Sequence, residues 1–70
     1  MSPRYFLDQL HLHGLTKDDV EWLLAQYGLT SPDQLSDDTC LDLIRFVKER
    51  RKYGPTLQEA WARYIQGDDT

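Results

Sequence analysis

The sequence predicts an all-α protein, built as a compact bundle of four to five short helices. Each of its four glycines follows a stretch of helical spacing, where a residue without a Cβ can take the left-handed conformation that ends a helix. Two prolines each follow a serine, the order expected for an N-cap and a first helical position. Apolar residues recur three and four positions apart, and no segment alternates as a strand does. The glycines are Gly14, Gly28, Gly54 and Gly67, and the prolines are Pro3 and Pro32.

The first two predicted helices lie before residue 28. Ser2 caps the first, which runs to residue 13. Thr16 begins the second helix with a capping box that Asp19 completes. Trp22 lies off the apolar stripe of this helix, so it either widens the buried face against the first or last helix or stands exposed as a binding anchor. The stripe consists of Val20, Leu23, Leu24 and Tyr27.

The remaining helices begin at equally clear signals. Ser31 and Pro32 open a helix of one or two turns, and Ser36 caps the longest helix. Thr56 begins a C-terminal helix over 56–66, which Gly67 ends, and we expect the acidic tail over 67–70 to be frayed. The longest helix has a stripe of Cys40, Leu43, Ile44 and Val47, flanked by Leu41 and Phe46. Residues 1–70 are thus expected to form a single domain with a core of Phe6, Leu10, Val20, Leu23, Leu24, Leu43, Ile44, Val47, Leu57, Trp61 and Ile65.

Size and composition argue against an enzyme. A 70-residue chain hides only roughly 60% of its unfolded surface, which leaves no room for a deep catalytic cleft. Cys40 is the one cysteine, and its place in an apolar stripe favours packing over reactivity. His11 and His13 lie on opposite sides of a helix, so they do not suggest a shared metal. We therefore expect no catalysis, no metal and no cofactor. We also expect a cytoplasmic location, because no apolar run is long enough for a membrane span.

The distribution of charge singles out one segment. The chain has a net charge of -4, yet five cations against Glu49 give +4 between residues 45 and 52 and leave -8 elsewhere. Such a run can meet an acidic protein or a nucleic-acid backbone, with Tyr53 beside it to stack on a base. Lys and Arg are also favoured at the end of any helix by its dipole, without a function. The five cations are Arg45, Lys48, Arg50, Arg51 and Lys52.

A resemblance to a known family covers about half of the chain. From Leu15 to Arg51 the order is a capped helix, a turn at Tyr27-Gly28-Leu29, a very short helix and a longer capped helix. This order resembles the ubiquitin-associated (UBA-like) domains, and it implies a UBA-like three-helix centre at about residues 15–52. The strings VEWLLAQYGL (20–29) and SPDQLS (31–36) are similar to helical modules appended to bacterial and phage single-strand annealing and recombination proteins. The resemblance implies a docking module whose turn, here Tyr27-Gly28-Leu29, contacts the partner together with the last helix.

We therefore expect a non-enzymatic module that binds another protein, in a DNA-processing or recombination assembly. The contact would be made by Tyr27, Gly28 and Leu29 or by the basic end of the long helix. The alternative is direct binding of nucleic acid, with the five cations on phosphates and Tyr53 on a base, and its affinity would fall steeply with salt. No membrane partner is expected, and the sequence leaves the oligomeric state open.

Overall fold

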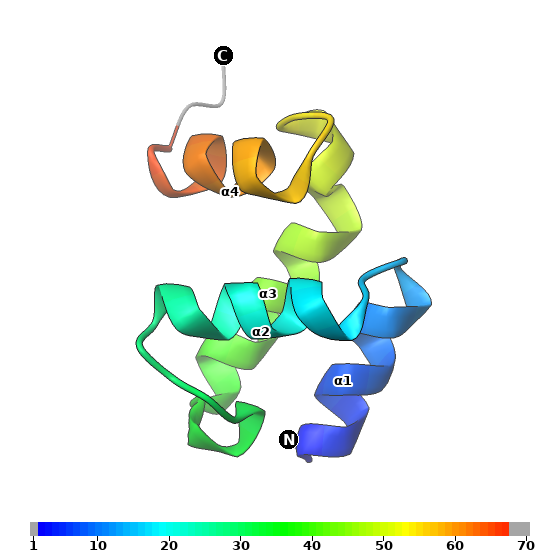
Figure 1. The fold of residues 1–70 in the computed structure, drawn as a ribbon, viewed down its shortest axis with the longest axis vertical. Helices are drawn as coiled ribbons and strands as arrows, with labels where there is room; N and C mark the ends of the chain where they lie inside the picture. The colour runs from blue at the N-terminus through cyan, green and yellow to red at the C-terminus, as the bar shows by residue number, and fades with distance from the viewer. Residues whose placement is uncertain (1, 68–70) are drawn as a thin grey trace.

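A computed structural model describes residues 2–67, and all the regular structure within them is helical (Figure 1). This confirms the predicted all-α bundle. Residues 68–70 of the predicted acidic tail lie outside the described residues. The elements are α1 (Pro3–Leu12), α2 (Lys17–Gln26), the 3₁₀-helix η1 (Pro32–Gln34), α3 (Asp37–Glu49), the 3₁₀-helix η2 (Arg50–Lys52) and α4 (Leu57–Ile65).

The α-helices begin where the capping signals predict. The Thr16 hydroxyl accepts from the backbone N–H of Asp19 at 3.2 Å, and the Asp19 carboxylate accepts from the N–H of Thr16 at 3.1 Å. The hydroxyls of Ser2, Ser36 and Thr56 each accept from the N–H three residues further on. These bonds satisfy N–H groups that have no partner within the helix, so the four starts are set by local chemistry.

Glycine ends α1 and α2 in the predicted way. Gly14 has a φ of 91°. The N–H of Leu15 donates to the carbonyl oxygen of Leu10 at 3.1 Å, and this bond between residues five positions apart is characteristic of a Schellman motif. Gly28 repeats this arrangement at the end of α2 with a φ of 70°. A residue with a Cβ would be strained at both positions.

Gly54 follows a different rule, and the left-handed conformation predicted for it is wrong. Its φ lies outside the left-handed region. Gly54 is buried, and a Cβ at this position would lie 3.1 Å from both the backbone nitrogen of Ala60 and the Cβ of Glu59. The first turn of α4 therefore requires a glycine here by close approach, which is a tertiary contact that a local pattern does not contain.

The core lies between α1, α2 and α3 and extends to α4. In Figure 1, α3 crosses behind α2, and α4 lies beside the C-terminal end of α3, at the opposite end of the molecule from η1. Ten of the eleven predicted core residues are buried, but Ile65, in the last turn of α4, is 60% exposed. The burial of Ile65 was thus predicted wrongly, because periodicity gives the apolar face of a helix and not how far its neighbours cover it. The core also contains Leu15, Cys40, Phe46 and Ala60.

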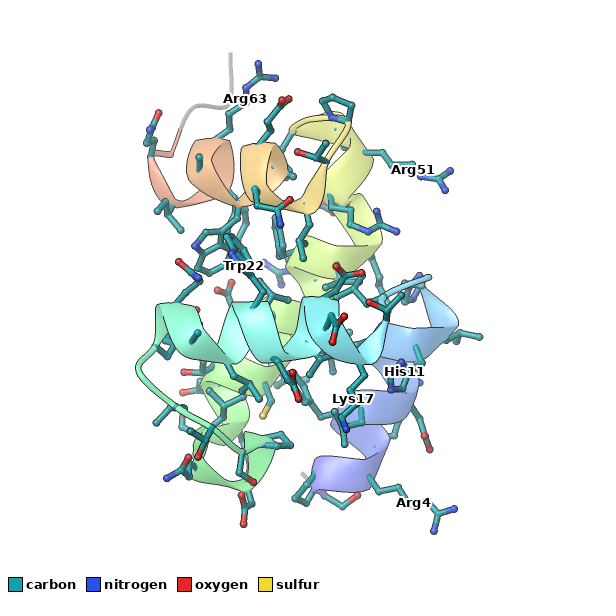
Figure 2. The ribbon with its side chains drawn as sticks, viewed as in Figure 1. Arg4, His11, Lys17, Trp22, Arg51 and Arg63 are labelled. Atoms are coloured by element: carbon teal, nitrogen blue, oxygen red, sulfur yellow. The ribbon has the colours of Figure 1, made fainter. Side chains whose placement is uncertain are left out.

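An aromatic cluster fixes α4 against α3. Phe46 is fully buried on α3, with its ring centroid 5.2 Å from that of Trp61 and 5.0 Å from that of Tyr64. The Tyr64 hydroxyl donates to Oδ1 of Asp42 at 2.5 Å. Trp22 is half-buried and lies between α2 and α4 (Figure 2), which agrees with its interpretation as a side chain that widens the buried face. Aromatic packing from α2 and α3 therefore decides where α4 lies.

Candidate functional site

The five predicted cations lie on the C-terminal part of α3 and on η2, and they differ in exposure. Arg45, Lys48, Arg51 and Lys52 are exposed, and Figure 2 shows Arg51 extended away from the ribbon. Arg50 is half-buried. Burial thus separates one cation with a structural role from four that are free to meet a partner.

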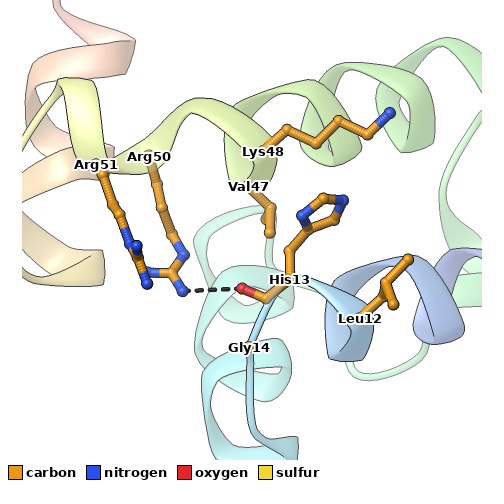
Figure 3. A pocket seen from close by; sticks show the side chains of 7 residues that line it. All are labelled: Leu12, His13, Gly14, Val47, Lys48, Arg50 and Arg51. Carbon is orange, nitrogen blue, oxygen red and sulfur yellow. Dashed lines mark hydrogen bonds between the residues drawn. The ribbon is translucent and has the colours of Figure 1, made fainter.

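Arg50 ties η2 to the end of α1. Its Nη2 donates to the carbonyl oxygen of His13 at 2.9 Å, between residues 37 positions apart (Figure 3). A Cβ on Gly14 would approach Nη2 to 3.2 Å, so the glycine leaves room for the guanidinium. The Nε–H of Arg50 is buried and has no acceptor within residues 2–67. Arg50 therefore holds the two helix ends together, a role that its place in a basic run did not indicate.

A hollow of about 510 Å³ opens beside Arg50, between the end of α1 and the end of α3 (Figure 3). Three of the residues lining it are cations, and none is acidic. Leu12, which is 72% exposed, and Val47 give it an apolar side. We call this site the basic hollow, and its lining consists of Leu12, His13, Gly14, Val47, Lys48, Arg50 and Arg51.

A second concavity of about 400 Å³, which we call the mixed groove, is lined by residues of α1 and α3. Two of its side chains are large, apolar and exposed: Tyr5 is 51% exposed and Leu41 is 55% exposed. Lys48 lines both the mixed groove and the basic hollow, so the two sites are contiguous. We call them together the α1–α3 face. The groove is lined by Tyr5, Leu41, Ile44, Arg45, Lys48 and Glu49.

Tyr53 takes part in the packing of α4. Its ring centroid lies 5.4 Å from that of Tyr64 and 6.5 Å from that of Phe46. Its carbonyl oxygen accepts from Nη1 of Arg63 at 2.7 Å. The side chain predicted to stack on a base is therefore half-buried in the cluster that fixes α4.

The turn at Tyr27, Gly28 and Leu29 lies away from the cations. The Tyr27 ring packs edge-on against Trp61, with centroids 5.9 Å apart, and Leu29 is half-buried against the core. Burial raises the pKa of Tyr27, and the negative charge of Asp42 raises it further. The end of α2 and the end of α3 lie on opposite sides of Figure 1, so the structure does not bring the two predicted contact sites together.

Cys40 and the two histidines lie in different surroundings. Cys40 is buried, and this burial, aided by the charge of Asp37, raises the pKa of its thiol, which disfavours the nucleophilic thiolate. His11 Nδ1 lies 2.8 Å from the carbonyl oxygen of Leu15 and donates to it, while His13 lines the basic hollow.

Within residues 2–67, no group of three or more His, Cys, Asp and Glu side chains is placed to hold a metal ion. No helix among these residues is long and apolar enough to cross a membrane.

Comparison of the chain with protein families, curated proteins and solved structures gives no significant match. The candidate site thus rests on the geometry of the α1–α3 face. Sequence reasoning did not single out Tyr5 or Leu12, and it named Leu41 only as the flank of a buried stripe. The available signal was that all three are large apolar residues outside the apolar stripe of their own helix.

Proposed function

We propose that this chain is a non-enzymatic docking module that binds another protein through its α1–α3 face. The observation that carries the proposal is the mixed groove, where Tyr5 and Leu41 stay exposed beside Arg45 and Lys48. Protein interfaces commonly combine apolar anchors with a polar or charged rim. Charge complementarity then indicates a partner segment that is both acidic and apolar.

Direct binding of nucleic acid is the second candidate, and the four exposed cations favour it. We rank it second for two reasons. Tyr53, the aromatic residue predicted to stack on a base, is engaged with Phe46 and Tyr64. The exposed apolar side chain of Leu41 also has no use in a phosphate contact, whereas a protein partner can bury it. The resemblance to modules of annealing and recombination proteins makes a DNA-processing assembly the first setting in which to look for the partner.

A pair of matched variants tests this proposal. Leu41→Asp introduces a negative charge into the mixed groove, and Gln58→Asp introduces the same charge at an exposed position of α4. Proteins captured from a lysate of the native cells by the wild-type chain should be lost with Leu41→Asp and kept with Gln58→Asp, both before and after nuclease treatment. Equal capture by the two variants, or a loss of all capture after nuclease treatment, would contradict the proposal.

A further inference from the structure

We propose that the basic hollow is a binding site for a doubly charged phosphate group, carried by a phosphorylated side chain of the docked protein. This inference rests on the proposed docking function, because the hollow and the mixed groove share Lys48. A segment that lies in the groove therefore contacts a side chain that also lines the hollow.

The charge of the hollow matches a dianion. Lys48, Arg50 and Arg51 line it, and no carboxylate is among its lining residues. Cations that meet around one hollow repel one another, and an anion between them removes this repulsion. A carboxylate brings one negative charge, whereas a phosphorylated serine or threonine brings roughly -1.5 to -2 and three acceptor oxygens.

Arg50 gives the hollow a fixed donor. Its hydrogen bond to the His13 carbonyl and its approach to Gly14 hold the guanidinium in place before any ligand arrives. A guanidinium fixed in this way loses little conformational freedom on binding, and its planar fork suits phosphate oxygens. Leu12 and Val47 give the hollow an apolar side next to these donors.

Helix capping explains only part of this arrangement. Arg50 bonds to the end of α1, and Lys48 lies in the last turn of α3, where the helix dipole favours a cation. Arg51 is exposed and lies beyond α3 in η2, yet it lines the same hollow. Because η2 directly continues α3, the helix dipole favours a cation here as well, but replacing Arg51 tests the ligand site without removing the hydrogen bond that Arg50 makes to the end of α1.

The test is an NMR titration of the full chain at pH 7.5 and constant ionic strength, first with inorganic phosphate and then with acetate. Phosphate should shift the backbone amide signals of Gly14 and of residues 48–52 in a saturable way, and acetate should not. Arg51→Ala should weaken phosphate binding roughly tenfold, the effect of one charge-assisted hydrogen bond. Arg4→Ala removes an exposed cation near the start of α1, far from Arg51 in Figure 2, and should leave the titration unchanged. Equal responses to both anions, or an unchanged affinity in Arg51→Ala, would show that the cations only cap the helices.

The source of the phosphate is tested with a phosphoserine pentapeptide, the same peptide with glutamate, and a single-stranded oligonucleotide with a 5′-phosphate. The phosphoserine peptide should bind more tightly than the glutamate peptide and the oligonucleotide. Tighter and steeply salt-dependent binding of the oligonucleotide would overturn the assignment to a protein. The two proposals fail separately: the absence of phosphate binding leaves the Leu41→Asp result standing, and capture that does not depend on Leu41 leaves the phosphate titration standing.

Discussion

Replacing Arg50 should destabilise the fold, whereas replacing its neighbour Arg51 should not. Both are arginines of η2, but only Arg50 is half-buried and bonded to the His13 carbonyl at 2.9 Å. A hydrogen bond made by a charged group contributes roughly 1.5 to 3 kcal/mol. Removal of the buried, unpartnered Nε–H offsets about 1 kcal/mol of this loss. We therefore expect Arg50→Ala to lower the free energy of unfolding by about 0.5 to 2 kcal/mol.

Thermal and urea denaturation, followed by circular dichroism, measure this difference. For a chain of this size, the loss corresponds to a fall in Tm of roughly 2 to 16 °C. Arg50→Met keeps an apolar stem and isolates the hydrogen bond, and Arg51→Ala should stay within about 0.5 kcal/mol of the wild type. The reasoning would be refuted by an Arg50→Ala variant as stable as Arg51→Ala.

Three further predictions follow from the packing of α4. Phe46→Ala should lower the free energy of unfolding by roughly 3 to 5 kcal/mol, measured by urea denaturation, because Phe46 is fully buried. Leu41→Ala, at an exposed position, should lower it by less than about 0.5 kcal/mol, and similar values for the two variants would contradict the packing of α4 on Phe46. Gly54→Ala should destabilise by roughly 1 to 3 kcal/mol through the contact with Ala60, and a neutral result would show that α4 moves easily. Burial, followed by the hydrogen bond to Asp42, raises the pKa of Tyr64 from 10.0 to about 12. The folded state therefore favours the protonated phenol, so the free energy of unfolding should fall as pH rises between these values. The free energy of unfolding of Tyr64→Phe should fall less over this range, and an equal pH dependence of the two proteins would contradict the raised pKa of Tyr64.

The starts of the α-helices and the ends of α1 and α2 could be predicted because the chemistry that sets them is local. The Thr16–Asp19 capping box and the glycine at position 14 act within a few residues, and the structure contains both. The predictions of a left-handed Gly54 and a buried Ile65 were wrong because both properties depend on contacts with other elements of the fold. The space around Gly54 is set by the first turn of α4, and the exposure of Ile65 depends on how far other elements reach along α4.

Of the two predicted contact sites, the basic run contributes residues to the α1–α3 face and the turn at Tyr27-Gly28-Leu29 does not. The different roles of the cations in this run could not be predicted from the sequence. Arg50 and Tyr53 were both predicted to contact a partner. Contacts with distant parts of the chain place Arg50 against the end of α1 and Tyr53 against Tyr64. The exposure of Tyr5 and Leu41 on neighbouring helices depends on how α1 packs on α3. Periodicity within one helix does not contain that arrangement.

Photo-crosslinking from the mixed groove tests the central claim most directly. A benzoylphenylalanine in place of Leu41 lies on the proposed docking surface, and the same residue in place of Gln58 lies on α4, whose residues line neither the mixed groove nor the basic hollow. Irradiation in native cells should give a discrete adduct from position 41 that proteinase removes and nuclease does not, with no such adduct from position 58. An adduct that nuclease removes, or the same adduct from both positions, would contradict a protein-docking function for the α1–α3 face.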